Sequence, residues 1–237
     1  IEKKLFFILF YIKCYPTLDL AGFYFGVNRS QPLRWVKALL PIMEKTLGYE
    51  VVLPDRQINS IEEFQRKYPE IKDIFIDGTE RPIQRPKSGK KQKKNYSGKK
   101  KAHTIKNIVI SDRGRKIISL TPTKAGKAHD KKLLDKSGIM PNIPKYVAKW
   151  FDTGFLGVKT EQAMMPEKKP KGKELTPEQK QENSVISGIR VLSEHAINGP
   201  KRFRMLTDKF RNHIAGLDDK AMLIACGLWN YHLRMAT

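Results

Sequence analysis

The amino-acid sequence predicts an α/β protein in which a sheet region is preceded and followed by helices. Three observations support this prediction. Helix start and stop residues recur up to about residue 48, apolar runs of strand length lie between about 71 and 157, and helical patterning returns after about 176. At 237 residues the chain is long enough to bury a sizeable core.

The first region has the order of a helix-turn-helix. Thr17 is expected to cap a helix that runs to Phe25, and residues 26–28 form a turn. Ser30 is expected to cap a second helix, with Pro32 in its first turn. A helical hairpin without a DNA-binding role is the alternative, because the same pattern is common in proteins that never contact DNA.

Helical spacing assigns the two faces of that second helix. Three polar residues are expected to point outward and to contact DNA: Gln31, Arg34 and Lys37. Three apolar residues are expected to pack inward: Leu33, Val36 and Leu40. Upstream, the apolar run Leu5–Ile12 is too short to span a membrane and is expected to be part of a core helix. Ile1 in place of Met suggests an N-terminally truncated region.

The sheet region contains two apolar runs that each end on an acid. The first run, residues 73–77, ends on Asp77 and is followed at once by Gly78; the second, residues 146–157, contains Asp152 with a glycine close behind. Between them, a hairpin is expected around the turn at residues 112–114, followed by a short helix.

The last region is predicted to be helical after a polar insert near residues 159–176. Thr176, Pro177 and Gln179 form a capping-box start, and the helix should stop at the turn of residues 198–200. Glu194 lies in the middle of this helix. An unpaired acid buried there would be costly, so its presence suggests a role.

The charge of the chain points to a polyanionic partner. The sequence carries 46 Lys and Arg against 24 Asp and Glu, a net charge of +22, which favours nucleic acid. A membrane surface would require an amphipathic or lipidated anchor, and none is evident. The only cysteines, Cys14 and Cys226, lie far apart and lack metal-type spacing, so a reducing cytoplasm fits best.

Residues 85–101 concentrate this charge, with nine cations and no acid. The cations expected to hold DNA phosphates are Arg85, Lys91, Lys93 and Lys94. Tyr96 could stack on a base. His103 could approach the site, but the favoured interpretation is a packed strand histidine. A flexible, solvated loop that attracts any polyanion is the alternative for the whole run.

The three acids Asp77, Asp152 and Glu194 are the candidate chemical groups. No phosphate-binding loop, dinucleotide fingerprint, nucleophile elbow or paired zinc histidines occur in the sequence. Carboxylates that converge on magnesium, surrounded by cations that hold phosphates, are what phosphodiester cleavage requires. Turn-forming aspartates and a solvated glutamate are the alternative.

On these motifs the chain resembles the DDE-superfamily transposases of bacterial insertion sequences, in the branch related to Harbinger-type elements. "YPTLDLAGFYFGVNRSQPLRWV" is similar to the family's helix-turn-helix, "FIDGTERPIQRP" to its first-acid strand, "FDTGFLG" to its second-acid strand and "RVLSEHAINGPKRFR" to its last-acid helix. The resemblance implies a ribonuclease-H-like mixed sheet flanked by helices, with Asp77, Asp152 and Glu194 as the triad. It also implies Mg²⁺ as cofactor, with two ions and with Mn²⁺ as a substitute.

The resemblance extends to residues around Glu194. Arg190 and Lys201 have the spacing of the family's Arg and Lys and are expected to contact DNA, although Arg190 could instead pair with Glu194. Ser187 stands where the signature has tyrosine, which puts a tyrosine-dependent contact in doubt.

The implied organisation is a helix-turn-helix region at 1–48, a linker at 49–70 and a catalytic domain at 71–237. The implied activity is metal-dependent cleavage of DNA at element ends and strand transfer into target DNA. The expected partners are double-stranded DNA and further copies of the chain assembled on it, without a membrane, in a nucleoid-associated cytoplasmic setting. An inactive remnant that only binds DNA is the alternative.

Overall fold

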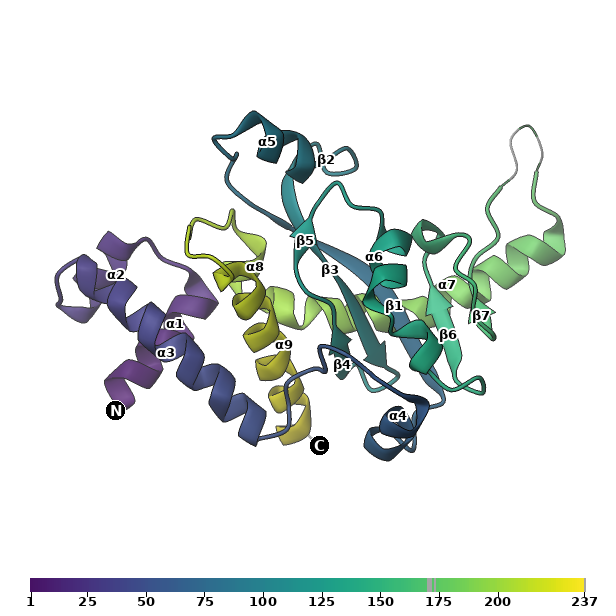
Figure 1. Cartoon of the computed structure of the whole chain (residues 1–237), viewed down its shortest axis with the longest axis horizontal. Coiled ribbons are helices and arrows are strands. Elements are labelled where there is room, and N and C mark those ends of the chain that lie inside the picture. The colour runs from purple at the N-terminus through teal and green to yellow at the C-terminus, as the bar shows by residue number, and fades with distance from the viewer. Residues whose placement is uncertain (170–171, 173, 237) are drawn as a thin grey trace. The chain divides into compact units, whose positions relative to one another are not determined.

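The computed structural model describes residues 1–169, 172 and 174–236, which form two compact units. The first unit combines residues 1–54, 81–105 and 198–237, and the second combines residues 55–80 and 106–197. Figure 1 traces their helices and strands along the chain. Each unit is described by itself below.

Three helices open the first unit: α1 (Glu2–Cys14), α2 (Leu18–Phe25) and α3 (Ser30–Tyr49). Thr17 caps α2 by accepting a hydrogen bond from the Leu20 amide, and Gly26 ends it in a left-handed conformation with φ of 61°. Phe7 of α1 packs against Phe25 and Trp35, with ring centroids 5.1 and 4.9 Å away. Aromatic packing therefore holds the three helices together.

The start of α3 differs from the prediction, because Ser30 is already helical and does not cap the helix. The side chain of Asn28 instead accepts hydrogen bonds from both the amide and the hydroxyl of Ser30, each at 3.0 Å. Asparagine and serine side chains can both accept hydrogen bonds from amides at the start of a helix. Here Asn28, two residues before Ser30, accepts from the Ser30 amide.

The C-terminal part of the first unit consists of the short elements η3 (Pro200–Arg202) and α8 (Arg204–Thr207) and the long helix α9 (Leu217–Met235). Helix α9 packs against α3, and the Asn230 side chain donates to the Val52 carbonyl at 2.8 Å. The sequence predicted that the last region is helical but gave no bounds for α9. Residues 81–105 add α5 (Gly89–Asn95) and β2 (Tyr96–Ser97), so part of the expected basic loop is a helix.

The strands form a mixed sheet in the order β2-β3-β1-β6-β7, with β4 and β5 paired to β3 among the residues described. The remaining strands are β1 (Asp73–Pro82), β3 (Ala102–Asp112), β4 (Ile117–Leu120), β5 (Lys124–Ala125), β6 (Ala148–Phe151) and β7 (Ala163–Met164). Strand β6 runs parallel to both β1 and β7, whereas β3 and β4 are antiparallel across the predicted turn.

Helices complete the second unit: α4 (Ile61–Lys67), α6 (Asp130–Ser137), η1 (Met140–Asn142), η2 (Thr153–Phe155) and α7 (Pro177–Asn198). Its core is rich in isoleucine and phenylalanine from the strands and from α4, including Ile74, Ile76, Ile108, Phe64 and Phe151. Burial of such side chains contributes roughly 1.5–3 kcal/mol each.

The predicted class, an α/β fold with a mixed sheet flanked by helices after a helical region, is confirmed. The capping box of α7 is also present, because Thr176 and Gln179 exchange amide-to-side-chain hydrogen bonds at 2.9 and 3.3 Å. Residues 49–70 contain α4. The polar insert near 159–176 includes residues 170, 171 and 173, which lie outside the described residues. No described helix is long and apolar enough to cross a membrane.

Candidate active site and DNA-contacting residues

Asp77 and Asp152 lie next to each other in the sheet. Strands β1 and β6 are parallel, with Ile76 opposite Phe151, and each acid follows one of these paired residues. Neighbouring strands lie about 4.8 Å apart, so the two acids lie beside each other at the same level of the sheet. The sequence predicted that both acids end strands. Asp152 does follow the end of β6, but β1 continues past Asp77 to Pro82, and it is the strand register that brings the two acids together.

Each of these acids binds the amide of the residue after it. Asp77 Oδ1 accepts from the Gly78 amide and Asp152 Oδ1 accepts from the Thr153 amide, both at 2.7 Å. Burial raises the pKa of Asp77, and the nearby charge of Asp152 raises it further, while the Gly78 amide and Arg190 oppose this. The pair of acids therefore forms a partly desolvated anionic site.

Arg190 of α7 provides the nearest described cation to this pair. Its Nη2 lies 3.5 Å from Asp152 Oδ1, and its side chain is 17% exposed. Of the two roles left open for Arg190, pairing or DNA contact, the structure shows an ion pair, and its partner is Asp152. Arg190 thereby links the last long helix of the second unit to the end of β6.

Glu194 lies one helical turn beyond Arg190 and is exposed. The described part of the chain contains no ion pair of Glu194 and no group of three His, Cys, Asp or Glu side chains arranged to hold a metal ion. Convergence of all three acids therefore stays a prediction.

Asp130, at the start of α6, is a site residue that the sequence patterns did not single out. A Cβ atom added to Gly78 would lie 2.7 Å from Asp130 Oδ1, and one added to Gly154 would lie 3.4 Å from Asp130 Oδ2. Both glycines follow a candidate acid closely. The carboxylate of Asp130 thus occupies the space that these glycines leave, and its charge contributes to the raised pKa of Asp77.

Lys106 holds Asp130 in place. Its Nζ lies 2.9 Å from Asp130 Oδ1 and 3.2 Å from Glu80 Oε1, and it donates to the Ala128 carbonyl at 3.1 Å. Burial lowers the pKa of Lys106, but its bonds to Asp130 and Glu80 outweigh this and the pKa lies above its ordinary value. The signal in the sequence that could have indicated this close neighbour is the glycine that follows each acid.

The donor set fits a hard divalent cation. In Asp77 and Asp152 the Oδ1 atoms accept the amide hydrogen bonds, and the described residues give neither Oδ2 atom a hydrogen bond. The charge of Asp152 contributes to the raised pKa of Asp77, and a cation between the two carboxylates would relieve that repulsion. Carboxylate oxygens are the ligands that magnesium and manganese prefer.

Residues predicted to contact DNA occupy several elements of the first unit. Arg34 and Lys37 are exposed on α3, whereas Gln31 is half-buried. Val36 and Leu40 are fully buried on the opposite side, as the helical spacing predicted, and Leu33 is half-buried. Lys201 is exposed in η3.

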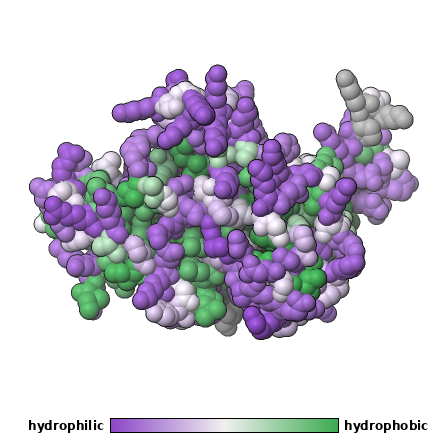
Figure 2. Space-filling model, in the orientation of Figure 1, coloured by the Kyte–Doolittle hydropathy of each residue, from purple (hydrophilic) through white to green (hydrophobic). Residues whose placement is uncertain are grey.

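The basic segment around α5 presents its cations to solvent. Lys91, Lys93 and Lys94 are exposed, and Figure 2 shows hydrophilic side chains over this segment. Arg85 Nη2 donates to Gln92 Oε1 at 3.1 Å, which ties the segment to α5. Tyr96 is 45% exposed, and its ring meets His103 edge-on at 5.7 Å.

Two adjacent acids thus lie on parallel strands of a mixed sheet, in a cationic chain that opens with three helices. The chain belongs to the DDE superfamily endonucleases: that family model matches residues 76–230, and the model described as the helix-turn-helix of DDE superfamily endonuclease matches residues 1–48.

One relative extends over nearly the whole chain. It is described as a probable transposase for insertion sequence element IS702 from Microchaete diplosiphon. The two are 32% identical over 239 residues, which cover 99% of this chain and 82% of the relative. No solved structure gives a significant match.

Proposed function

We propose that the protein is a transposase that cleaves DNA at the ends of an insertion sequence and joins the freed ends to target DNA. Membership of the DDE superfamily endonucleases and the likeness to a probable transposase support this activity. The observation that carries the proposal is the parallel register that sets Asp77 beside Asp152.

In this proposal Asp77, Asp152 and Glu194 are the ligands of two Mg²⁺ ions, which Mn²⁺ can replace. The divalent ions supply Lewis acidity and a nucleophilic oxygen at neutral pH. Glu194 lies one turn of α7 beyond Arg190, and in the proposal its carboxylate joins the two aspartates when the ions bind. Arg190 holds Asp152 through the ion pair at 3.5 Å and sets the direction in which its free oxygen points.

The chemistry consists of two phosphoryl transfers. In the first, a water oxygen bonds to phosphorus, the P–O3′ bond breaks, and the element keeps a 3′-hydroxyl while the flank keeps a 5′-phosphate. In the second, that 3′-hydroxyl oxygen bonds to a target phosphorus and the target's own P–O3′ bond breaks. The same acids serve both steps, because each step is an in-line displacement in which an oxygen attacks phosphorus and a P–O bond on the opposite side breaks.

Asp130 acts as a positioning residue in the proposal. Its carboxylate packs over the backbone at Gly78 and Gly154 and is itself fixed by Lys106. In the proposal it sets the separation of the two backbone segments that carry Asp77 and Asp152.

DNA binding is divided between two parts of the first unit. Gln31, Arg34 and Lys37 of α3 read the element ends, while Arg85, Lys91, Lys93, Lys94 and Lys201 hold phosphates without regard to sequence. We expect further copies of the chain to assemble on double-stranded DNA at the nucleoid. A chain that only binds DNA is the second candidate, and the exposed position of Glu194 is the observation that favours it.

Replacement of Glu194 by Gln separates the two candidates. The substitution keeps the shape and removes one anionic ligand, so nicking of a duplex that carries the element's ends should collapse while DNA affinity holds or rises slightly. Glu182→Gln is the matched control, because it makes the same charge change at another exposed position of α7.

Nicking should require magnesium or manganese and should stop in chelator. Nicking by Glu194→Gln at the level of the parent protein, or in chelator, would exclude the three-acid mechanism. A parent protein that binds the ends but never nicks them would establish the binding-only candidate.

A further inference from the structure

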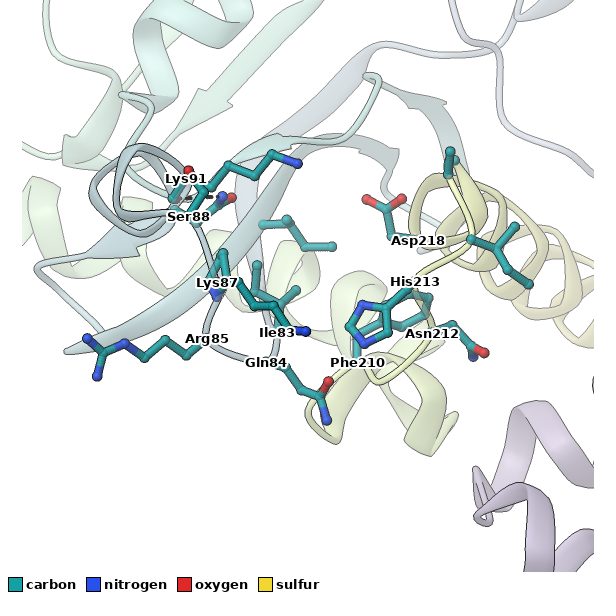
Figure 3. A pocket seen from close by; sticks show the side chains of 16 residues that line it. Ile83, Gln84, Arg85, Lys87, Ser88, Lys91, Phe210, Asn212, His213 and Asp218 are labelled. Carbon is teal, nitrogen blue, oxygen red and sulfur yellow. Dashed lines mark hydrogen bonds between the residues drawn. The ribbon is translucent and has the colours of Figure 1, made fainter.

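A cavity of about 740 Å³ lies entirely within the first unit. Two segments far apart in the sequence line it: residues 83–95 with Ile105, and residues 210–218. In Figure 3, Arg85, Lys87 and Lys91 lie on one side, and Phe210, Asn212 and His213 lie on the other. Its volume falls in the range of about 300–1,000 Å³ that is typical of sites for small organic ligands.

Main-chain hydrogen bonds join the two walls at the base of the cavity. The Phe210 amide donates to the Pro82 carbonyl at 2.9 Å, and Ile83 forms a parallel bridge with Phe210. The Ile83 amide donates to the His103 carbonyl at 2.9 Å. The apolar side chains of Ile83, Ile105 and Phe210 therefore form a base that backbone pairing keeps in place.

The wall at residues 210–216 is also anchored from behind. The Arg211 amide donates to the Tyr15 hydroxyl at 2.7 Å, and the Asn212 side chain donates to the hydroxyls of Tyr11 and Tyr15 at 3.3 Å. On the other wall, Gln92 donates to the Pro86 carbonyl at 2.7 Å and fixes α5. The cavity is thus built before any ligand arrives.

The chemistry of the lining suits one nucleotide. Exposed cations at Arg85, Lys87 and Lys91 favour phosphate at the mouth, while the apolar base favours the flat face of a nucleobase. Gln84 supplies an amide group of the kind that pairs with base edges. A base-paired duplex cannot enter a cavity of this size, so only an unpaired base can reach the apolar surface.

We infer that this cavity binds one unpaired nucleotide of the DNA on which the protein acts. The inference rests on the proposed function, since it assumes that DNA is the partner. Residues 83–91 and 210–218 would then distinguish distorted DNA from a regular duplex. Phosphate contacts on α5 cannot make that distinction.

The test compares two short duplexes that differ only in one unpaired thymidine. The parent protein should bind the duplex with the unpaired nucleotide roughly tenfold more tightly, because stacking of one base is worth about that much. Ala215→Trp places a bulky ring at an exposed lining position and should reduce the ratio of the two affinities to about one. His213→Ala, on the same wall, should lower the ratio less.

Lys93→Ala is the matched control, because Lys93 is an exposed cation of α5 that is not among the cavity's lining residues. It should weaken both duplexes equally and leave the ratio unchanged. Equal affinity of the parent protein for both duplexes, or a ratio that Ala215→Trp leaves intact, would overturn the inference while DNA binding stands.

Two further outcomes are decisive. Failure of the parent protein to bind either duplex would overturn the proposed function and the inference together. The second outcome uses polyglutamate of equal charge as a competitor. If it displaces the duplex with the unpaired nucleotide and abolishes the preference for that duplex, the occupant is an acidic peptide and the inference alone is overturned.

Discussion

Two groups of lysines, one in each compact unit, differ in their surroundings. In the second unit, Lys106 and Lys149 are only 6% and 1% exposed, and each bonds to several named partners. In the first unit, Lys91, Lys93 and Lys94 of α5 are exposed to solvent. Buried cations hold geometry, because their bonds have fixed partners in a medium of low dielectric constant. Exposed cations give affinity that salt can remove.

The largest effect is expected at Asp77. Asp77→Asn should lower nicking on the order of a thousandfold, because an anionic ligand becomes a neutral amide. It should also raise the melting temperature at pH 7. Burial raises the pKa of Asp77 in the folded protein, so ionisation of this acid opposes folding as the pH rises through that pKa.

Thermal unfolding at two pH values checks the second part of this expectation. The gain in melting temperature should be present at pH 7 and should vanish once the pH falls below the ordinary Asp pKa of about 3.9. Asp135→Asn, at an exposed position of α6, is the control and should give no comparable gain. A lower melting temperature for Asp77→Asn at pH 7 would contradict the burial argument.

The next largest effect is expected at Lys149, whose Nζ donates to the carbonyls of Pro144, Val147 and Glu161 at 3.1, 2.8 and 3.2 Å. Lys149→Met keeps the length of the side chain but leaves the three carbonyl oxygens without their donor. The free energy of unfolding should fall by about 2–4 kcal/mol, as measured by denaturant titration. Lys93→Met on α5 should change it by less than about 0.5 kcal/mol, and equal losses would erase the contrast between the units.

Gly78→Ala tests the positioning role of Asp130. The new methyl would lie 2.7 Å from Asp130 Oδ1, so the carboxylate or the strand must shift. Nicking should fall roughly tenfold to a hundredfold with DNA affinity unchanged, as for residues that orient metal ligands. Gly89→Ala is the control, because a Cβ there meets no atom within 4 Å. Full activity of Gly78→Ala would show that Asp130 does not set the position of Asp77.

The smallest effects are expected among the exposed cations. Arg34→Ala should reduce discrimination between element ends and random duplex by roughly 1–3 kcal/mol. Neutralising Lys91, Lys93 and Lys94 should weaken both duplexes alike and reduce the salt dependence by roughly one unit of slope per lost phosphate contact. Binding titrations across a salt series separate the two effects. Equal weakening of specific and random DNA by Arg34→Ala would make α3 a scaffold helix.

Features with a local cause could be predicted from the sequence. The cap at Thr17, the capping box of α7 and the hairpin between β3 and β4 depend on residues close together along the chain. The adjacency of Asp77 and Asp152 depends on the pairing of distant strands, which spacing alone does not reveal.

Asp130 could not be recognised for the same reason. In the sequence it is an ordinary acid in the first turn of a short helix, and its proximity to Gly78 and Gly154 comes from tertiary packing. The sequence did not predict helix α5, because a run of lysines is typical of a solvated loop. The hydrogen bonds of Gln92 to Arg85 and Pro86 show how a single polar residue orders it.

The first unit draws its helices from both ends of the chain, which has a consequence for the time at which it can fold. The Arg211 guanidinium lies 4.2 Å from the centre of the Tyr15 ring, and Arg234 donates to the carbonyl of Glu50, 184 residues earlier. At a synthesis rate of about 5–20 residues per second, roughly 10 to 40 s pass on the ribosome before α9 can cover α3. During that interval helices α2 and α3, which would contact DNA in the proposed function, are already synthesised, but α9, against which α3 packs, is not.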